Sequence, residues 1–268
     1  MKNKPLASIL ITNYNKEKFL KKTINSCLKQ NYKNKEIIFF DDNSNDNSLK
    51  IMQKYKKVFL IKNKKKKYLS SPLNQINGVV ETFKESKGNY LFLLDSDDRF
   101  KTNKISNIIK IFEKNKEVKF IQDVPKMNSK NIIKLKRKKH FFSIWPSFYN
   151  TSCITAERVF FKEFLKLIQK NKFPNLEIDA RLSIYAFLRN KFKILGNSYT
   201  FYNYDMYGIT SNYNKFSFQW WKKRKEAFEY MFYLMIKLGL NIKKGPDYYI
   251  TNIINFLIDL FCNQKKLS

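Results

Sequence analysis

Apolar and polar residues alternate along the first half of the chain in blocks that are typical of an α/β fold. Short continuous apolar runs have the length and composition of buried strands, and they cover residues 6–11, 36–40, 58–61 and 90–94. Segments with apolar residues at helical spacing separate them, at 16–30, 45–55 and 73–86. Because the strands are apolar throughout rather than at every second position, we expect a mostly parallel, doubly wound sheet with helices on both faces.

Polar clusters follow three of these predicted strands, at residues 12–15, 41–42 and 95–98. In an open parallel sheet, ligands bind beyond the carboxyl ends of the strands, so we expect the clusters to line one cleft. The sequence contains neither of the glycine-rich patterns that cradle phosphates in dinucleotide-binding and P-loop proteins. Phosphates bound in this cleft would therefore be held by another partner.

The predicted strand at 90–94 runs directly into Asp95, Asp97 and Asp98. Carboxylates at the end of a buried strand repel one another and resist burial, so something must compensate their charge. Hard oxygen ligands suit Mg2+ or Mn2+, which also carry substrate phosphates. The alternative is an acidic turn in which Asp98 or a neighbour caps a helix that begins near Thr102.

The second half of the chain alternates less regularly. We expect a helix at 104–114, a strand at 118–121, a helix opening at 174–182 and long aromatic helices at 216–240 and 245–262. The aromatic stretch 141–149 suits either core packing or an acceptor wall. We divide the chain into a catalytic domain, 1–212, with a nucleotide half, 1–122, and an acceptor half, 123–212, followed by a helical extension, 213–268.

The charge of the chain is strongly positive, with 53 Lys and Arg against 22 Asp and Glu and a net charge of +31. Such a field attracts nucleotides, anionic lipids, nucleic acid or acidic glycans. A genome rich in A and T would also produce this Lys-, Asn-, Ile- and Phe-rich composition, so charge alone does not select a partner. The two long C-terminal helices either pack as a subdomain or dock on an anionic membrane.

The chain has too few histidines and cysteines to favour a catalytic or metal site built from these residues. His140 is the single histidine and lies in a basic stretch, while the three cysteines (Cys27, Cys153 and Cys262) match no zinc or disulfide pattern and are expected to be reduced thiols. No window approaches the roughly 18 apolar residues of a membrane span. The N-terminal apolar run is too short for a signal peptide, so we expect a cytoplasmic protein, with peripheral contact at the inner face of the membrane as an option.

Three motifs in order give the chain a family resemblance. Residues 8–16 (SILITNYNK), 37–44 (IIFFDDNS) and 88–98 (GNYLFLLDSDD) resemble those of the inverting GT-A glycosyltransferases of family two. The likeness covers roughly residues 5–115 and continues more weakly over 145–212. It implies a Rossmann-like GT-A fold and a metal-dependent transfer from a nucleotide-sugar, with a UDP-sugar as the first choice.

The resemblance also implies roles for residues of the cleft. Thr12, Tyr14 and Asp42 would contact the nucleoside, Asp95 would face the ribose or the metal shell, and Asp97 would be the principal metal ligand. Thr12 stands where many members have Pro, a change that removes no group the chemistry needs.

Two further positions are implied less directly. Lys67 and Asn74 lie where members often contact the nucleotide or the cleft wall. The alternative for Lys67 is a solvated lysine run at 64–67.

The same resemblance implies that Asp179 is the catalytic base. In the family an Asp ahead of a Leu-bearing helix takes this role, often directly preceded by Glu. Here Ile178 separates Glu177 from Asp179, so Glu177 is the alternative base. A carboxylate at a helix start is also a common cap.

We therefore predict an inverting glycosyltransferase that uses Mg2+ or Mn2+ and acts on a glycan or lipid-linked acceptor, in bacterial surface polysaccharide or lipopolysaccharide synthesis. The alternatives are a non-catalytic basic module for nucleic acid or anionic lipid, and a metal-dependent nucleotidyltransferase. The basic module gives no reason for acids to gather at strand ends, so no nucleic-acid partner is expected.

Overall fold

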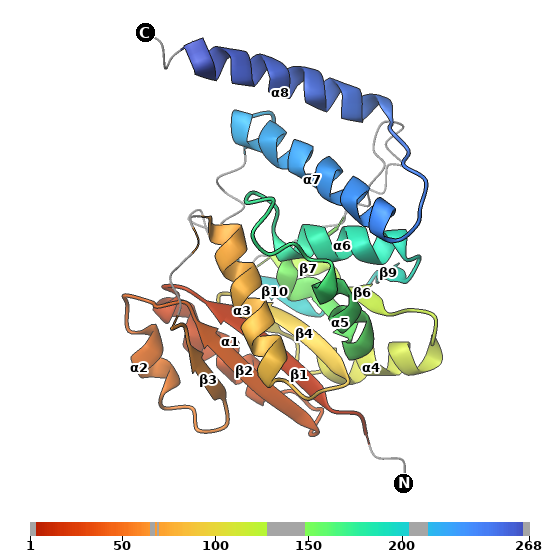
Figure 1. The fold of residues 1–268 in the computed structure, drawn as a ribbon. Helices are drawn as coiled ribbons and strands as arrows, with labels where there is room; N and C mark the ends of the chain where they lie inside the picture. The colour runs from red at the N-terminus through yellow and green to blue at the C-terminus, as the bar shows by residue number, and fades with distance from the viewer. Residues whose placement is uncertain (1–3, 65–67, 69, 128–147, 204–213, 265–268) are drawn as a thin grey trace.

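The centre of the protein is a seven-stranded sheet covered by helices on both faces (Figure 1). The computed structural model describes residues 4–64, 68, 70–127, 148–203 and 214–264. In spatial order the strands are β3 (Phe59–Lys62), β2 (Lys35–Asp41), β1 (Ala7–Asn13), β4 (Tyr90–Asp95), β8 (Ile154–Glu157), β6 (Phe120–Gln122) and β9 (Phe192–Ile194). The predicted mostly parallel α/β sheet is confirmed.

One strand departs from the parallel arrangement. Strand β8 lies between β4 and β6 and runs antiparallel to both, whereas β3, β2, β1 and β4 are mutually parallel. This antiparallel strand is compatible with the predicted mostly parallel sheet, but its position was not predicted. A strand of four residues is too short to show a period in the sequence, and it directly precedes helix α5 (Arg158–Lys166), which was not predicted either.

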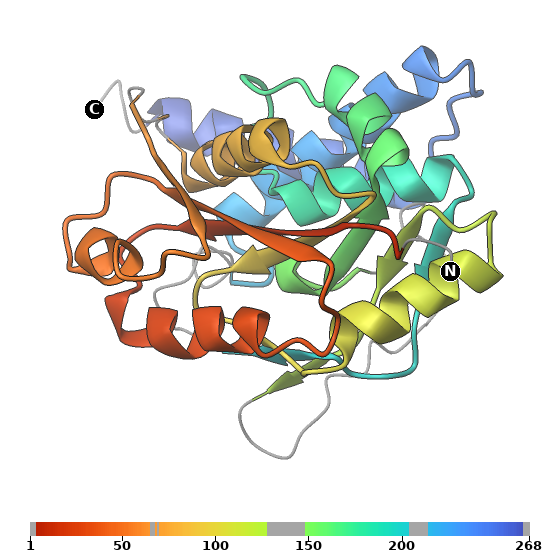
Figure 2. The same ribbon diagram turned by 90° about the horizontal axis from the view of Figure 1, so that it is seen from below.

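Helices cover the two faces of the sheet in separate layers, as the view in Figure 2 shows. Helices α1 (Glu17–Leu28) and α4 (Lys104–Lys114) pack on one face, and α3 (Ser71–Glu85), α5 and α6 (Ile178–Leu188) pack on the other. Successive residues of β1 supply the two cores in turn, since Ile9 and Ile11 face α1 and α4 while Leu10 faces α3. This two-sided burial explains why the strands are apolar throughout. The short helix α2 (Ser48–Met52) follows β2.

A second, three-stranded sheet lies against the carboxyl end of β4. It consists of β5 (Arg99–Phe100), β10 (Thr200–Tyr202) and β7 (Pro125–Met127), with β10 in the middle. Strand β5 begins directly after Asp98, and the 3-10 turn η1 (Thr151–Cys153) contacts both β4 and β10. The second half of the chain is thereby brought to the acidic end of β4.

Two long helices complete the fold. Helix α7 (Phe218–Lys237) packs on α6, and α8 (Pro246–Gln264) packs on α7 as the outermost element (Figure 1). The predicted pair of C-terminal helices is confirmed, while the division at residue 212 stays a prediction. Over the described part of the chain, no helix is both long enough and apolar enough to cross a bilayer.

Several expectations fall on other parts of the chain. The described residues exclude His140, Lys67 and most of the basic and aromatic stretches at 126–149. The expected buried thiols are confirmed for Cys27 and Cys153, which are free. Burial raises the pKa of Cys27 to about 12, so this thiol stays protonated and unreactive.

Candidate active site

The polar clusters that follow β1, β2 and β4 meet at one edge of the sheet. Thr12 is in register with Asp95 and its carbonyl accepts the Ser96 amide at 3.2 Å. On the other side, the Asn13 carbonyl accepts the amide of Asp42 at 2.9 Å. The predicted convergence of these clusters is therefore confirmed, because parallel strands bring their carboxyl ends to the same edge.

The two acids at the end of β2 have different surroundings. Asp41 is buried and accepts hydrogen bonds from Asn13 Nδ2 at 2.9 Å and from Ser44 Oγ at 2.7 Å, so it shapes the turn. Asp42 is also buried and accepts from Asn63 Nδ2 at 2.7 Å. Beside them, at the end of β1, the ring of Tyr14 is 46% exposed. An exposed ring next to a bonded carboxylate is an arrangement that can hold a base and its ribose.

The first acid at the end of β4 is only weakly compensated. Asp95 accepts from Gln75 Nε2 at 3.0 Å and from Thr12 Oγ1 at 3.5 Å. Burial, and then the charge of Asp97, raises the pKa of Asp95 to about 7. Asp97 itself forms an ion pair with Lys16, whose Nζ lies 2.8 Å from Asp97 Oδ2. Lys16 thus neutralises part of the negative charge of this acidic cluster, but ionisation of Asp95 remains unfavourable.

The third acid, Asp98, joins the two sheets. It is buried and accepts from the Asn203 amide at 2.8 Å and from Asn150 Nδ2 at 3.1 Å. Burial and the neighbouring charges of Asp97 and Asp95 raise its pKa well above the usual range. It does not cap the next helix, because Asn103 holds the N-cap position of α4 without any side-chain cap. The alternative of a simple capping turn therefore does not hold for Asp98.

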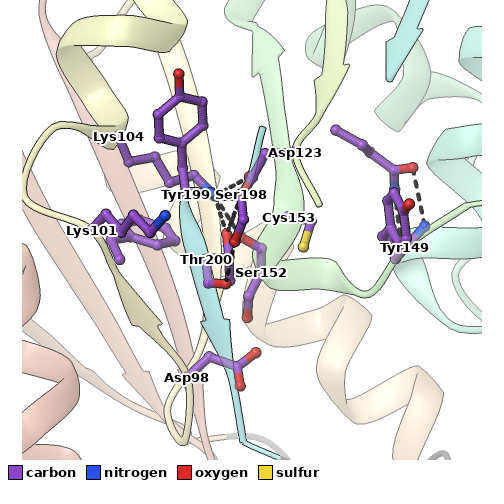
Figure 3. Close-up of polar contacts among 12 residues, drawn as sticks. Asp98, Lys101, Lys104, Asp123, Tyr149, Ser152, Cys153, Ser198, Tyr199 and Thr200 are labelled. Atoms are coloured by element: carbon purple, nitrogen blue, oxygen red, sulfur yellow. Dashed lines mark hydrogen bonds and ion pairs between the residues drawn. The ribbon is translucent and has the colours of Figure 1, made fainter. Parts of the chain in front are cut away.

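A fully buried ion pair joins Lys104 to Asp123, and Figure 3 shows it in the same region as Asp98. Lys104 Nζ donates to Asp123 Oδ1 at 2.7 Å, to the Ser152 carbonyl at 2.8 Å and to Thr200 Oγ1 at 2.7 Å, which uses all three of its protons. Ser152 Oγ in turn accepts the amide of Asp95 at 2.9 Å. Through these bonds Lys104 fixes η1 and β10 against the end of β4.

The predicted base comes to the same place from the other half of the chain. Asp179 lies half-buried in the first turn of α6, and its Oδ1 accepts the Ala180 amide at 2.6 Å. Burial, and then the charge of Glu177, raises the pKa of Asp179 to about 7, while Lys223 lowers it. The charge of Asp95 also raises the pKa of Asp179, so the two carboxylates are close enough to interact electrostatically.

Tyr202, on β10, lies among all of these acids. Burial is the main cause of its raised pKa, and the charges of Asp98, Asp95, Asp97 and Asp179 add to it, in that order. The phenol of Tyr202 is thus close enough to all four carboxylates to interact with them electrostatically. Nothing in the sequence distinguished it from the other tyrosines of the chain.

The segment that carries Asp179 is held by a buried arginine. The guanidinium of Arg181 is fully buried and donates to backbone carbonyls of the preceding loop, at Ile168, Gln169, Lys172, Phe173 and Leu176. The loop that contains these carbonyls precedes α6 and has no regular secondary structure. Arg181 therefore supplies the hydrogen bonds that a loop of this kind needs when it is buried.

Helix α7 holds the same segment from outside. Glu226 accepts the amide of Asn175 at 2.8 Å and Asn175 Nδ2 at 2.6 Å. Lys223 Nζ lies 2.5 Å from a carboxylate oxygen of Glu177. The C-terminal helices thus take part in building the site.

The acidic donors at the end of β4 fit a small divalent cation. Asp95 and Asp97 offer hard carboxylate oxygens, and burial together with the charge of Asp97 makes a negative charge on Asp95 unfavourable unless a cation compensates it. Among the described residues, no three acidic, histidine or cysteine side chains converge on one point. A cation held here would therefore complete its shell with substrate phosphates and water, as Mg2+ sites commonly do.

Asn74, which was predicted to contact the nucleotide or the cleft wall, is bonded to a nearby backbone segment. Both ends of the Asn74 amide bond to the backbone of Tyr68, with Tyr68 N donating at 2.8 Å and Tyr68 O accepting at 3.0 Å. Gln75, the next residue, reaches Asp95 instead. Sequence reasoning missed Gln75, Ser152, Arg181 and Tyr202, because each is a single polar residue whose partner is distant in the sequence.

The family model described as Glycosyl transferase family 2 matches residues 8–176. A relative named UDP-Glc:alpha-D-GlcNAc-diphosphoundecaprenol beta-1,3-glucosyltransferase WfaP, from Escherichia coli, is 40% identical over 113 residues, 41% of this chain and 43% of that protein. A putative teichuronic acid biosynthesis glycosyltransferase, TuaG of Bacillus subtilis (strain 168), is 30% identical over 106 residues, 38% of this chain and 40% of that protein. The matched part spans about two fifths of the length of these curated relatives.

Solved structures share the fold at low sequence identity. S. aureus TarS 1–349 in complex with UDP-GlcNAc has a TM-score of 0.62 and 15% identity, covering 94% of this chain and 70% of that one. The mannosyltransferase PcManGT from Pyrobaculum calidifontis, in complex with GDP-Man and Mn2+, has a TM-score of 0.60 and 10% identity, covering 96% and 70%. These similarities show that the fold is of the GT-A type, helical C-terminal region included.

Proposed function

The chain belongs to glycosyl transferase family 2, and we propose that it transfers a sugar from a nucleotide-sugar to an acceptor hydroxyl with inversion at the anomeric carbon. The observation that carries this proposal is that Asp179, from α6, and Asp95, at the end of β4, lie close enough for the charge of Asp95 to raise the pKa of Asp179. The acids of β4 suit a metal-bound diphosphate, and the acid of α6 suits a proton acceptor. The two groups come from distant parts of the chain, which favours a shared catalytic role over a local structural one.

The donor would bind across the ends of β1, β2 and β4. The exposed ring of Tyr14 would contact the base, with Thr12 and Asp42 at the nucleoside. Lys67 and Asn74 stay predictions for the cleft wall. UDP is the first nucleotide to test, because the names of TarS complexes and of WfaP include UDP or UDP-sugars, whereas PcManGT was solved with GDP-Man.

Asp97, with Asp95, would hold Mg2+ or Mn2+. The chemistry that such an ion supplies is Lewis-acid neutralisation of the charge that develops on the leaving diphosphate. Lys16 already pairs with Asp97 at 2.8 Å, so the same lysine is placed to exchange this carboxylate for a phosphate oxygen when the donor binds.

Asp179 would act as the general base. It takes the proton of the acceptor hydroxyl as the hydroxyl oxygen bonds to the anomeric carbon. The bond from that carbon to the diphosphate oxygen breaks, and the nucleoside diphosphate leaves with the bonding electrons. A pKa near 7 suits the task, because the base is then both available and strong enough at neutral pH.

Asp179 is favoured over Glu177 by what each carboxylate contacts. Glu177 is buried against α7 and is paired with Lys223. Asp179 forms no ion pair with any residue that the structure describes; it accepts a hydrogen bond from the Ala180 amide, and the charge of Asp95 raises its pKa. A base must reach the acceptor, and a carboxylate close enough to Asp95 to sense its charge is better placed for this than one paired with a lysine of α7.

The acceptor would be a glycan or a lipid-linked sugar of bacterial surface polysaccharide synthesis. The names of WfaP, which include a diphosphoundecaprenol-linked acceptor, and of TuaG, which include teichuronic acid, support this class.

The test is a thermal-shift panel of nucleoside diphosphates and nucleotide-sugars, with and without Mn2+, followed by product analysis for each donor that stabilises the protein. We expect Mn2+-dependent stabilisation by one nucleotide class and release of nucleoside diphosphate. Release of pyrophosphate would identify a nucleotidyltransferase instead. A lack of stabilisation by every nucleotide would contradict the proposal.

A further inference from the structure

Helix α8 buries a mostly polar face and exposes an apolar one, which is the reverse of most surface helices. Its buried side chains are mostly polar, with Asp247, Thr251 and Asn255 turned toward α7. Its exposed side chains are largely apolar and include Tyr249, Ile253, Phe256, Leu257, Leu260 and Phe261. A helix at the surface of a soluble protein normally buries its apolar face and exposes its polar one. The orientation of α8 therefore needs a cause.

Specific polar contacts hold α8 in this orientation. Arg224 Nη2 of α7 forms an ion pair with Asp247 Oδ2 at 2.8 Å, and its Nε donates to Thr251 Oγ1 at 3.1 Å. One turn further, Asn255 Nδ2 donates to the Trp221 carbonyl at 3.0 Å. Partners at spacings of four residues define one face of the helix, so α8 can turn its apolar face inward only by breaking all of these bonds.

The apolar residues that point outward form one stripe, which we call the α8 stripe: Tyr249, Ile253, Phe256, Leu257, Leu260 and Phe261. Ile253, Phe256 and Phe261 are 60%, 64% and 65% exposed. At about 100° per residue these positions cover a single side of the helix, and Asp259 falls off it. Helix α8 is the outermost element (Figure 1), and the exposure of these side chains places the stripe on the side of α8 opposite its polar contacts with α7.

Basic residues accompany the stripe. Lys243 and Lys244 are exposed just before the first turn of α8, and Lys265 and Lys266 follow the helix in the sequence. An apolar helix face with basic residues near its ends is the pattern of a helix that lies in the interface of an anionic bilayer. The chain as a whole carries a net charge of +31, which adds attraction to such a surface.

We propose that the α8 stripe docks the protein on an anionic lipid surface. A second copy of the chain is the main rival, and charge decides against it. Two chains of net charge +31 repel one another and would bring their lysine pairs into proximity, whereas anionic lipid neutralises them. The proposal goes beyond the proposed function, since lipid docking requires no donor, metal or acceptor.

The test is co-sedimentation of the full chain with vesicles of phosphatidylcholine, with or without phosphatidylglycerol. We expect binding to the anionic vesicles that weakens at high salt, and a loss of about tenfold or more in partitioning for the double variant Phe256→Ser and Leu260→Ser, because two large apolar side chains no longer enter the lipid. Lys243→Gln with Lys244→Gln should weaken binding to anionic vesicles only.

The matched control is Phe59→Ser with Val159→Ser, which removes two similarly exposed apolar side chains from β3 and α5. This control should bind as the unmodified chain does. Equal binding by the α8 variant and the unmodified chain would overturn the proposal, as would a lipid-free dimer that the α8 variant converts to a monomer. Melting temperatures of all variants establish that each is folded, and the binding readout is independent of transferase activity.

Discussion

The ammonium group of Lys223 lies 2.5 Å from a carboxylate oxygen of Glu177, and this contact ties helix α7 to the segment that carries Asp179. Glu177 raises the pKa of Asp179 and Lys223 lowers it, so the ion pair tunes the proposed base from outside the sheet. The charge of Lys223, on a C-terminal helix, thus affects the protonation of the proposed base.

The first prediction concerns pH. A base with a pKa near 7 is protonated and inactive below that value, so kcat/KM should rise with pH and level off above about 7. Lys223→Met removes a charge that lowers this pKa, so the rise should move to higher pH, with activity reduced at neutral pH and recovered in alkaline buffer. Lys222→Met, at the exposed neighbouring position, is the control and should keep the original profile. A uniform loss at every pH would mean that Lys223 is only structural.

The second prediction concerns the base itself. Asp179→Asn keeps the size and the capping oxygen of the side chain but cannot accept the proton, so turnover should fall by about 10²–10⁴. Binding of the nucleotide-sugar, measured by calorimetry, should change little. Glu177→Gln should retain far more activity than Asp179→Asn. The reverse order of the two variants would assign the base to Glu177.

The third prediction concerns the cation. Asp97→Asn removes one of the two hard anionic donors proposed for Mg2+ or Mn2+, so the extra stabilisation that Mn2+ gives to the nucleotide complex should disappear in a thermal-shift experiment. Glu113→Gln, an exposed acid on α4, serves as the control for lost negative charge. Retention of the full Mn2+ effect in Asp97→Asn would place the cation elsewhere.

The fourth prediction concerns the buried ion pair. Lys104 and Asp123 are both fully buried, so Lys104→Met leaves the Asp123 carboxylate without its cation. Removing one partner of a buried pair typically costs about 3–5 kcal/mol, and urea unfolding should report a loss of that size. Lys110→Met, on the exposed side of the same helix, should leave the free energy of unfolding nearly unchanged. Similar stabilities for the two variants would contradict the assigned role.

The fifth prediction concerns the packing of α3 on the sheet. A Cβ at Gly78 would lie 2.8 Å from Phe40 Cδ1 and 2.9 Å from Thr12 Cγ2, both closer than atoms pack. Overpacking costs about 1–3 kcal/mol and outweighs the gain of up to about 1 kcal/mol that Ala brings to a helix. Gly78→Ala should therefore lower the urea midpoint, while Gly196→Ala, where a Cβ meets nothing within 4 Å, should not. Equal urea midpoints for Gly78→Ala and the unmodified chain would show that Phe40 and Thr12 move enough to accommodate the added Cβ.

Much of the nucleotide half was predictable from the sequence because its signals are local. Strands such as β1 and β4 are buried on both faces and appear as apolar runs, and polar clusters stand where these runs end. Parallel pairing alone then brings Thr12, Asp42 and Asp95 to one edge. The position of Asp179 in a helix start was equally visible, although its role rested on the family resemblance.

Local patterns along the chain therefore indicate which segments form the sheet and where its acids gather. Only the tertiary structure decided that β8 runs antiparallel, that Gln75 reaches Asp95, and that Arg181, Lys223 and Glu226 hold the segment before α6. The physical reason is that a period or a motif is encoded among neighbours in the chain. The partner of a single buried charge depends instead on how whole helices and strands pack, and it may lie anywhere in the sequence.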